Sequence, residues 1–157
     1  FSKLFIHICE MHNISEKELN IRNRGAYFAE FWGCFLINYS MHSMNRVKDM
    51  ALTPFVIGAA FFLAVFLGYK VSGAHFNAAV SFATWLRPGE RDTKYLWYIP
   101  AQILGGIGAG CMITLMGFDL ILPDHAHDAT VSEAVILQAF FAFFLCLLYM
   151  HLNDPAT

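Results

Sequence analysis

The segment Ser72–Val80, which reads SGAHFNAAV, holds the side chains whose types and spacing could act on a solute. Asn77 stands where a short apolar element begins, and an asparagine at a helix N-cap bonds the free amides of the first turn. The amino end of a helix also carries a partial positive charge. Because an asparagine amide beside such an end offers donors to a water or hydroxyl oxygen and repels cations, this segment predicts a contact point for neutral, oxygen-bearing solutes.

The residues just before Asn77 supply backbone groups to the same segment. Gly73 permits a sharp turn, and the carbonyl groups of Gly73, Ala74 and His75 can accept hydrogen bonds along one wall. His75 has two possible roles, gating by protonation or donating a bond that fixes the loop, and the second is favoured. A nucleophile, a base and an orienting group do not occur together, so the sequence does not predict an enzyme.

The elements that must position this segment are long and apolar. Four stretches contain almost no charge, and each approaches or exceeds the ~20 residues that a helix needs to cross a bilayer. The element Asn77–Leu86 is only about half a bilayer long. A short apolar element after a full crossing predicts a re-entrant loop, Ser72–Leu86, that ends in a half-helix. The four long stretches are Ala26–Met44, Thr53–Tyr69, Tyr95–Leu122 and Val131–Leu152.

Composition agrees with a membrane location. Of 157 residues, 57% are hydrophobic and 14% are charged, and the mean hydropathy is +0.50; an average soluble domain carries about 25% charged residues. We therefore predict an all-α membrane protein with four transmembrane helices and one re-entrant half-helix. Its expected parts are an interfacial segment 1–24 with a short helix Glu16–Asn23, a main unit 25–122, and a last part 123–157 with an acidic loop, the fourth helix and a short tail.

The distribution of basic residues predicts the orientation. Most of the ten lysines and arginines fall on the side of the N-terminus, and only Arg46 and Lys48 fall on the opposite side. Because cytoplasmic loops carry the excess of basic residues, we expect the N-terminus in the cytoplasm, or in the matrix if the membrane is mitochondrial. The residues on the N-terminal side are Lys3, Lys17, Arg22, Arg24, Lys70, Arg87, Arg91 and Lys94.

The segment 72–80 resembles the first asparagine-containing loop of the aquaporin and glycerol-facilitator family, also called the major intrinsic proteins. The family motif reads Ser-Gly-Ala-His-x-Asn-Pro-Ala-Val, and the chain reproduces it with Ala78 in place of proline. Proline is favoured but not required at the first helical position, and alanine is a good helix former. Two more motifs follow in the right order: Ala29–Gly33 (AEFWG) is similar to the Ala-Glu-Phe-x-Gly of the family's first helix, and Tyr98–Gly105 (YIPAQILG) to the Tyr-x-x-Ala-Gln-x-x-Gly of its third.

The resemblance implies an aquaporin-like fold, here as an incomplete six-helix inverted-repeat bundle. It implies that Glu30 and Gln102 brace the loop backbone from behind and satisfy its buried amides. Asn77, Ala78 and Ala79 would then lie at a pore, beside the carbonyl wall. In the family, the residue twenty positions before the asparagine adds an aromatic wall to the selectivity filter; here that position is Ile57, so a wider or more apolar constriction is expected.

The chain departs from the family pattern in two places. The family's fourth helix carries a second glutamate brace, whereas here Glu133 lies too near the helix start and Gln138 or Phe143 stands near the expected position. That brace is expected to be lost or weakened. The given sequence also stops after the fourth helix and lacks the second asparagine motif, so one half-helix would have to be completed by further chain or by a partner.

Two functions are compatible with these features. The first is a passive channel for water or small uncharged solutes, in which half-helix dipoles, donor placement and diameter select the solute. The second is a non-conducting accessory subunit of a large membrane complex, such as a respiratory complex, that keeps the aquaporin-like scaffold. The expected partners are the lipid bilayer and, by family resemblance, either three further copies in a homo-tetramer or the subunits of a larger complex.

Other classes of ligand are not predicted. Net charge is −2 and no basic patch suggests nucleic acid. The four cysteines lie far apart, so neither a disulfide framework nor a zinc site is expected. The loop 123–129 contains His125 and His127 beside acidic residues, but nothing fixes their geometry and a solvated loop is favoured over a metal site. No cofactor is expected.

Overall fold

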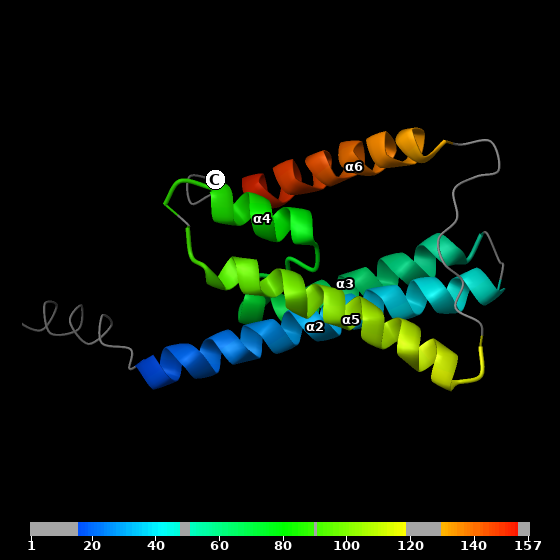
Figure 1. The fold of residues 1–157 in the computed structure, drawn as a ribbon, viewed down its shortest axis with the longest axis horizontal. Helices are drawn as coiled ribbons and strands as arrows, with labels where there is room; N and C mark the ends of the chain where they lie inside the picture. Colours follow the sequence, from blue (N-terminus) through cyan, green and yellow to red (C-terminus); the bar gives the residue numbers. More distant parts are fainter. Residues whose placement is uncertain (1–15, 48–50, 90, 119–129, 154–157) are drawn as a thin grey trace, which may run out of the picture.

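The computed structural model describes residues 16–47, 51–89, 91–118 and 130–153, and every regular element within them is a helix (Figure 1). The prediction of an all-α fold is confirmed. In chain order the helices are α2 (Glu16–Val47), α3 (Thr53–Ser72), α4 (Ala78–Leu86), α5 (Lys94–Leu115) and α6 (Val131–Leu152).

Helix α2 is the centre of the arrangement, because it packs along both α3 and α5 (Figure 1). The α2–α5 contact depends on Gly105. A β-carbon at that position would lie 2.3 Å from the carbonyl oxygen of Phe31 and 3.1 Å from the β-carbon of Cys34. Small residues allow helix backbones to approach closely where lipid supplies no hydrophobic driving force, so the glycine fixes how near α5 comes to α2.

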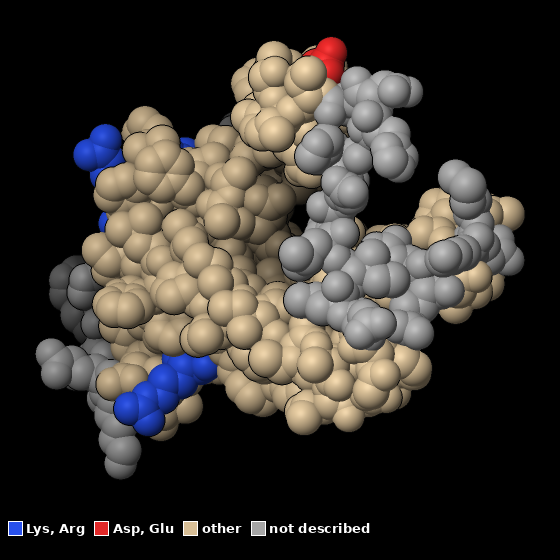
Figure 2. Space-filling model, turned by 45° about the vertical axis from the view of Figure 1, so that its right-hand side comes forward, with Lys and Arg blue, Asp and Glu red and all other residues tan. Residues whose placement is uncertain are grey.

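Three of the described helices, α3, α5 and α6, are long and apolar enough to cross a membrane. Four crossings were predicted, and the stretch that falls short of this criterion is α2. At 32 residues it is ~48 Å long, so its length suffices and its polarity does not. The structure explains that polarity, because Glu30 and Ser40 are buried, at 0% and 8% exposure, and therefore do not face lipid. The face drawn in Figure 2 is almost uncharged, with lysine and arginine only near its edge.

Helix α4 has the short length that the sequence predicts for a half-helix. Its 9 residues span ~13 Å, which is less than half of a bilayer's hydrocarbon core. The preceding helix α3 ends at Ser72 and is capped by Gly73, whose φ of 91° is left-handed and whose N–H donates to the carbonyl of Tyr69. The chain then turns through residues 73–77 and returns as α4, which packs against α5 and α6.

Two element bounds differ from those predicted. A separate short helix Glu16–Asn23 was expected, but α2 runs without a break from Glu16 to Val47, because Gly25 costs only about 1 kcal/mol in a helix and no proline intervenes. Helix α5 ends at Leu115 rather than Leu122, because Gly117 adopts a φ of 77°. Residues 1–15, which belong to the predicted interfacial segment, and the predicted acidic loop with His125 and His127 lie outside the described residues.

Candidate functional site

The carboxylate of Glu30, on α2, holds the loop that joins α3 to α4. Its Oε1 accepts hydrogen bonds from the Ser72 hydroxyl at 2.6 Å and from the His75 N–H at 2.9 Å. Its Oε2 accepts from the Phe76 N–H at 2.7 Å and from Gln102 Nε2 at 2.8 Å. The side chain is 0% exposed, and four donors directed at two oxygens match an ionised carboxylate, which only accepts. Glu30 thus binds the loop backbone directly, whereas Gln102 donates to Glu30 and to Ser81 and, among the described residues, makes no bond with the loop backbone.

The loop that Glu30 holds has an unusual backbone. Ala74 and Phe76 have φ values of 55° and 46°, in the left-handed region that residues with a β-carbon rarely adopt. Such conformations persist only where the surroundings determine them. Here the Ala74 N–H donates to the Ser72 hydroxyl at 3.0 Å, while the next two N–H groups donate to Glu30. All N–H groups from Gly73 to Phe76 thus have partners within the chain.

The carbonyl groups of the same loop are only partly used. Tyr98 donates to the Ser72 carbonyl at 2.9 Å, and the Cys34 thiol donates to the Phe76 carbonyl at 3.3 Å. Within the described residues, no donor reaches the carbonyl oxygens of Ala74 and His75. These two oxygens are therefore acceptors that the described part of the chain leaves available.

Asn77 caps the half-helix. It is extended, with φ −150° and ψ 128°, and its Oδ1 accepts from the Ala79 N–H at 2.8 Å. Ala78 takes the first helical position, where the family has proline. Because the cap fixes Oδ1, the amide is oriented and its Nδ2 group is left to donate elsewhere; among the described residues it has no acceptor. Asn77 is partly exposed, so a small molecule can reach it.

A second polar network fixes the ring of His75. The ring Nδ1 lies 3.0 Å from the Ser81 hydroxyl, and Gln102 Nε2 donates to that hydroxyl at 2.9 Å. Ser81 is 0% exposed and was missed from the sequence. Its position one turn after Asn77, on the face of α4 that meets α5, is the signal that could have identified it. This arrangement agrees with the favoured role of His75 in fixing the loop.

The ring of Phe76 fills a slot formed by two glycines, which sequence reasoning also missed. A β-carbon at Gly33 would lie 2.1 Å from this ring, and one at Gly68 would lie 2.7 Å from it. Phe76 is 8% exposed. The glycine in the AEFWG motif of α2 therefore serves the loop as directly as Glu30 does.

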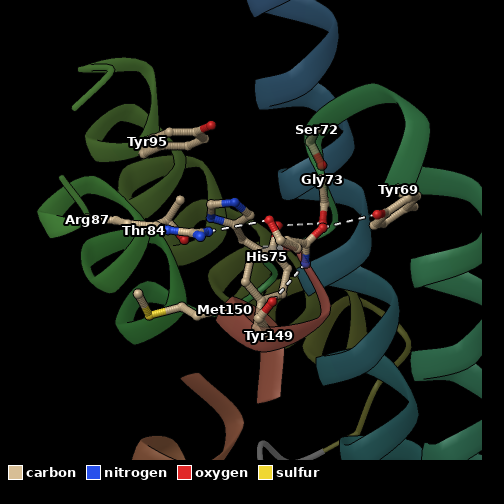
Figure 3. Close-up of a pocket in the computed structure, with 10 residues that line it drawn as sticks. Tyr69, Ser72, Gly73, His75, Thr84, Arg87, Tyr95, Tyr149 and Met150 are labelled. Carbon is tan, nitrogen blue, oxygen red and sulfur yellow. Dashed lines mark hydrogen bonds between the residues drawn. The ribbon is translucent and has the colours of Figure 1, made fainter. Parts of the chain in front are cut away.

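A pocket of about 330 Å³ opens beside the loop, between α3, α4, α5 and the carboxyl end of α6 (Figure 3). We call it the loop pocket. Of the residues predicted at a pore, Gly73 and His75 line this pocket, whereas Ile57, which is partly exposed and lies further up α3, does not. The remaining predicted pore residues, Ala74, Asn77, Ala78 and Ala79, do not line it either. The lining residues are Tyr69, Ser72, Gly73, His75, Thr84, Arg87, Tyr95, Tyr149, Met150 and Asn153.

Helix α6 has no second brace within the described residues. Glu133 forms a capping box with Thr130, whose N–H it accepts at 2.7 Å. Gln138 and Phe143 are exposed. That the second brace is lost or weakened stays a prediction. Among those residues there is also no group of three histidine, cysteine or acidic side chains placed to hold a metal ion.

The described helices, the capped half-helix α4 and the loop braced by a buried glutamate are together typical of one class of membrane channel protein. The comparisons agree with that class: the family model "Major intrinsic protein" matches residues 19–157. The chain belongs to this family. Its members are passive channels rather than enzymes.

Some of the relatives are named as water channels and others as glycerol channels. A glycerol uptake facilitator protein from Pseudomonas aeruginosa is 41% identical over 96 residues, which are 57% of this chain and 34% of that protein. Aquaporin TIP2-1 from Arabidopsis thaliana is 30% identical over 147 residues, 83% of this chain and 58% of that protein. An aquaglyceroporin from Toxoplasma gondii is 33% identical over 107 residues, 66% and 41% of the two chains. The chain spans less than two thirds of the length of each of these relatives.

Proposed function

We propose that this chain forms the first half of a channel through which water or small uncharged solutes cross a membrane passively. The observation that carries the proposal is the division of the loop's polar groups. Its N–H groups from Gly73 to Phe76 are bound within the chain, whereas the carbonyls of Ala74 and His75 and the Nδ2 of Asn77 are left to a ligand. Two acceptors beside one donor suit a water molecule or a hydroxyl group, each of which both donates and accepts.

The same arrangement disfavours ions. Asn77 lies at the amino end of α4, where the free N–H groups and the helix dipole give a partial positive charge. A cation that reaches this point meets that charge, and an anion meets the carbonyl oxygens. We therefore propose that selection against ions comes from fixed dipoles rather than from a charged side chain.

We further propose that the constriction at Ile57 admits glycerol-sized solutes. An aliphatic side chain there leaves the constriction wider than the aromatic wall of the family pattern. The relatives named above carry both water-channel and glycerol-channel names, so both solutes are candidates. Membership of the family also favours a homo-tetramer, with the N-terminus on the cytoplasmic side as the basic residues predict. The accessory-subunit alternative gains no support from the described residues or from these relatives.

Stopped-flow osmotic shrinkage of proteoliposomes that contain the full-length protein tests the proposal, with Asn77→Asp as the decisive variant. Aspartate is as good an N-cap as asparagine, so α4 should keep its structure. The substitution replaces the Nδ2 donor by an acceptor that faces the solute oxygen. We expect water permeability to fall roughly 5- to 100-fold, as when a desolvated polar group is left without its hydrogen-bond partner. The matched control is Asn20→Asp, an exposed position at the start of α2, which should leave permeability unchanged.

Two results would contradict the proposal. If vesicles with the wild type and vesicles with every variant are all as impermeable as empty vesicles, the channel is excluded. A wild-type permeability that survives Asn77→Asp unchanged would exclude Asn77 as the solute's donor.

A further inference from the structure

The carboxyl end of α6 is held at the loop pocket by polar bonds rather than by burial. None of the residues of α6 is buried, and among the described helices α6 contacts α4. Tyr69 donates to Asn153 Oδ1 at 3.0 Å, and Arg87 Nη1 reaches the Asn153 carbonyl at 3.4 Å. Tyr149 makes a further bond, to the Gly73 carbonyl. A helix end attached in this way can shift its side chains without opening a packed core.

Tyr149 contacts the loop directly (Figure 3). Its hydroxyl donates to the Gly73 carbonyl at 3.0 Å. Its ring stands edge-on to His75, with centroids 5.0 Å apart and an interplanar angle of 69°. A β-carbon at Gly73 would lie 3.0 Å from the Tyr149 hydroxyl oxygen, so a bulkier residue in place of this glycine would crowd the hydroxyl.

The carbonyl that Tyr149 binds is one of those expected to serve a passing solute. It directly precedes the two carbonyls, of Ala74 and His75, that receive no donor from the described residues. A hydroxyl group is the chemical equivalent of the solute's own end, since it donates and accepts as water does. Tyr149 therefore stands in the place of the first solute molecule at this end of the carbonyl row.

We propose that Tyr149 limits and selects permeation at the loop pocket, by competing with the solute for the Gly73 carbonyl and by narrowing the path with its ring. This inference rests on the proposed channel function. The two parts of the side chain have separate effects: the hydroxyl lowers the rate for any oxygen-bearing solute, and the ring excludes the larger ones. A solute enters when the Tyr149 hydroxyl exchanges its bond with the Gly73 carbonyl for a bond with the solute.

The test measures water and glycerol permeability in proteoliposomes of full-length wild type, Tyr149→Phe and Tyr149→Ala. Phenylalanine keeps the ring and removes the competing donor, so both permeabilities should rise roughly two- to tenfold, the factor that one net hydrogen bond is worth. Alanine also removes the ring, so glycerol permeability should rise further and the glycerol-to-water ratio should increase by at least about threefold. Leu148→Ala, at a neighbouring side chain that is 56% exposed, is the control for truncation on α6 and should leave both permeabilities at the wild-type value.

The outcomes separate this inference from the channel proposal. If the wild type is impermeable and Tyr149→Ala conducts, the channel proposal and the role of Tyr149 are both supported. Permeable wild-type vesicles with unchanged rates and ratio in both Tyr149 variants overturn the role of Tyr149 alone. Vesicles that stay impermeable in all variants, with the protein shown by circular dichroism to be folded, overturn the channel and this inference together.

Discussion

Replacement of Glu30 by glutamine gives the sharpest test of how the loop is held. Each carboxylate oxygen accepts one bond from a loop N–H and one from a side chain: Oε1 from His75 and Ser72, and Oε2 from Phe76 and Gln102. Glutamine has one oxygen, and its NH₂ group cannot accept. Whichever way the amide turns, one backbone N–H and one side-chain donor lose their acceptor.

The loss in the free energy of unfolding can be worked out from the donors that lose their acceptor. The hydroxyl of Ser72 or the amide of Gln102 can rotate toward another acceptor, but the backbone N–H cannot. An unpaired buried N–H costs about 1–3 kcal/mol, and the two remaining bonds lose their charge assistance, about 1 kcal/mol each. We therefore expect Glu30→Gln to lower the free energy of unfolding by roughly 3–5 kcal/mol, a large part of the 5–15 kcal/mol typical of a folded domain.

The assay is thermal unfolding of the purified protein in detergent, followed by circular dichroism. For a chain of this size each 1 kcal/mol shifts the midpoint by roughly 2–4 °C, so the midpoint should fall by roughly 6–20 °C. Glu133→Gln is the control, because Glu133 is exposed and caps only its own helix; it should change the midpoint far less. Equal midpoints for Glu30→Gln and wild type would refute the bracing role.

Two further predictions concern the slot of Phe76 and the constriction. Gly33→Ala should lower the unfolding midpoint by roughly 2–12 °C, since its β-carbon would meet the Phe76 ring and overpacking costs about 1–3 kcal/mol. Gly58→Ala, with nothing within 4 Å, should instead raise the midpoint slightly; equal shifts for the two alanines would contradict the slot. Ile57→Phe should reduce glycerol permeability while water permeability falls less, in the same vesicle assay, and an unchanged glycerol-to-water ratio would remove Ile57 from the constriction.

Local features of the site could be predicted from the sequence because their signals are local. An asparagine before a short apolar element predicts a capped half-helix, and the structure confirms α4 with Asn77 as its cap. An acid inside an apolar stretch is costly and so predicts a buried partner, and Glu30 has four. The brace from Gln102 needed the family resemblance, because only the pairing of distant helices brings the amide of Gln102 to the carboxylate of Glu30.

The missed residues depend on facing and depth, which a single sequence does not encode. Ser81 and Ser72 are chemically ordinary, and only the rotation of α4 and α3 aims them into the network. Gly33 appears in the sequence only as the last residue of the AEFWG motif, and nothing in that motif indicates that it makes room for the Phe76 ring. Tyr149 stands at the end of a stretch that is apolar all round, so no periodicity singles it out; its partner Gly73 lies 76 positions away in the chain.

The irregular backbone of the loop depends on one buried acid, Glu30. At membrane depth no bulk water is present to bind an irregular backbone, so such a segment persists only if its groups are satisfied by protein or line a wet cavity. Glu30 and Ser72 satisfy the N–H groups of residues 74–76. The carbonyls cannot be satisfied by a carboxylate, and those of Ala74 and His75 receive no donor from the described chain. The carbonyls of Ser72, Gly73 and Phe76 accept bonds from side chains on three helices. The carbonyls of Ala74 and His75 are therefore the ones that water or solute would pair with in the proposed channel.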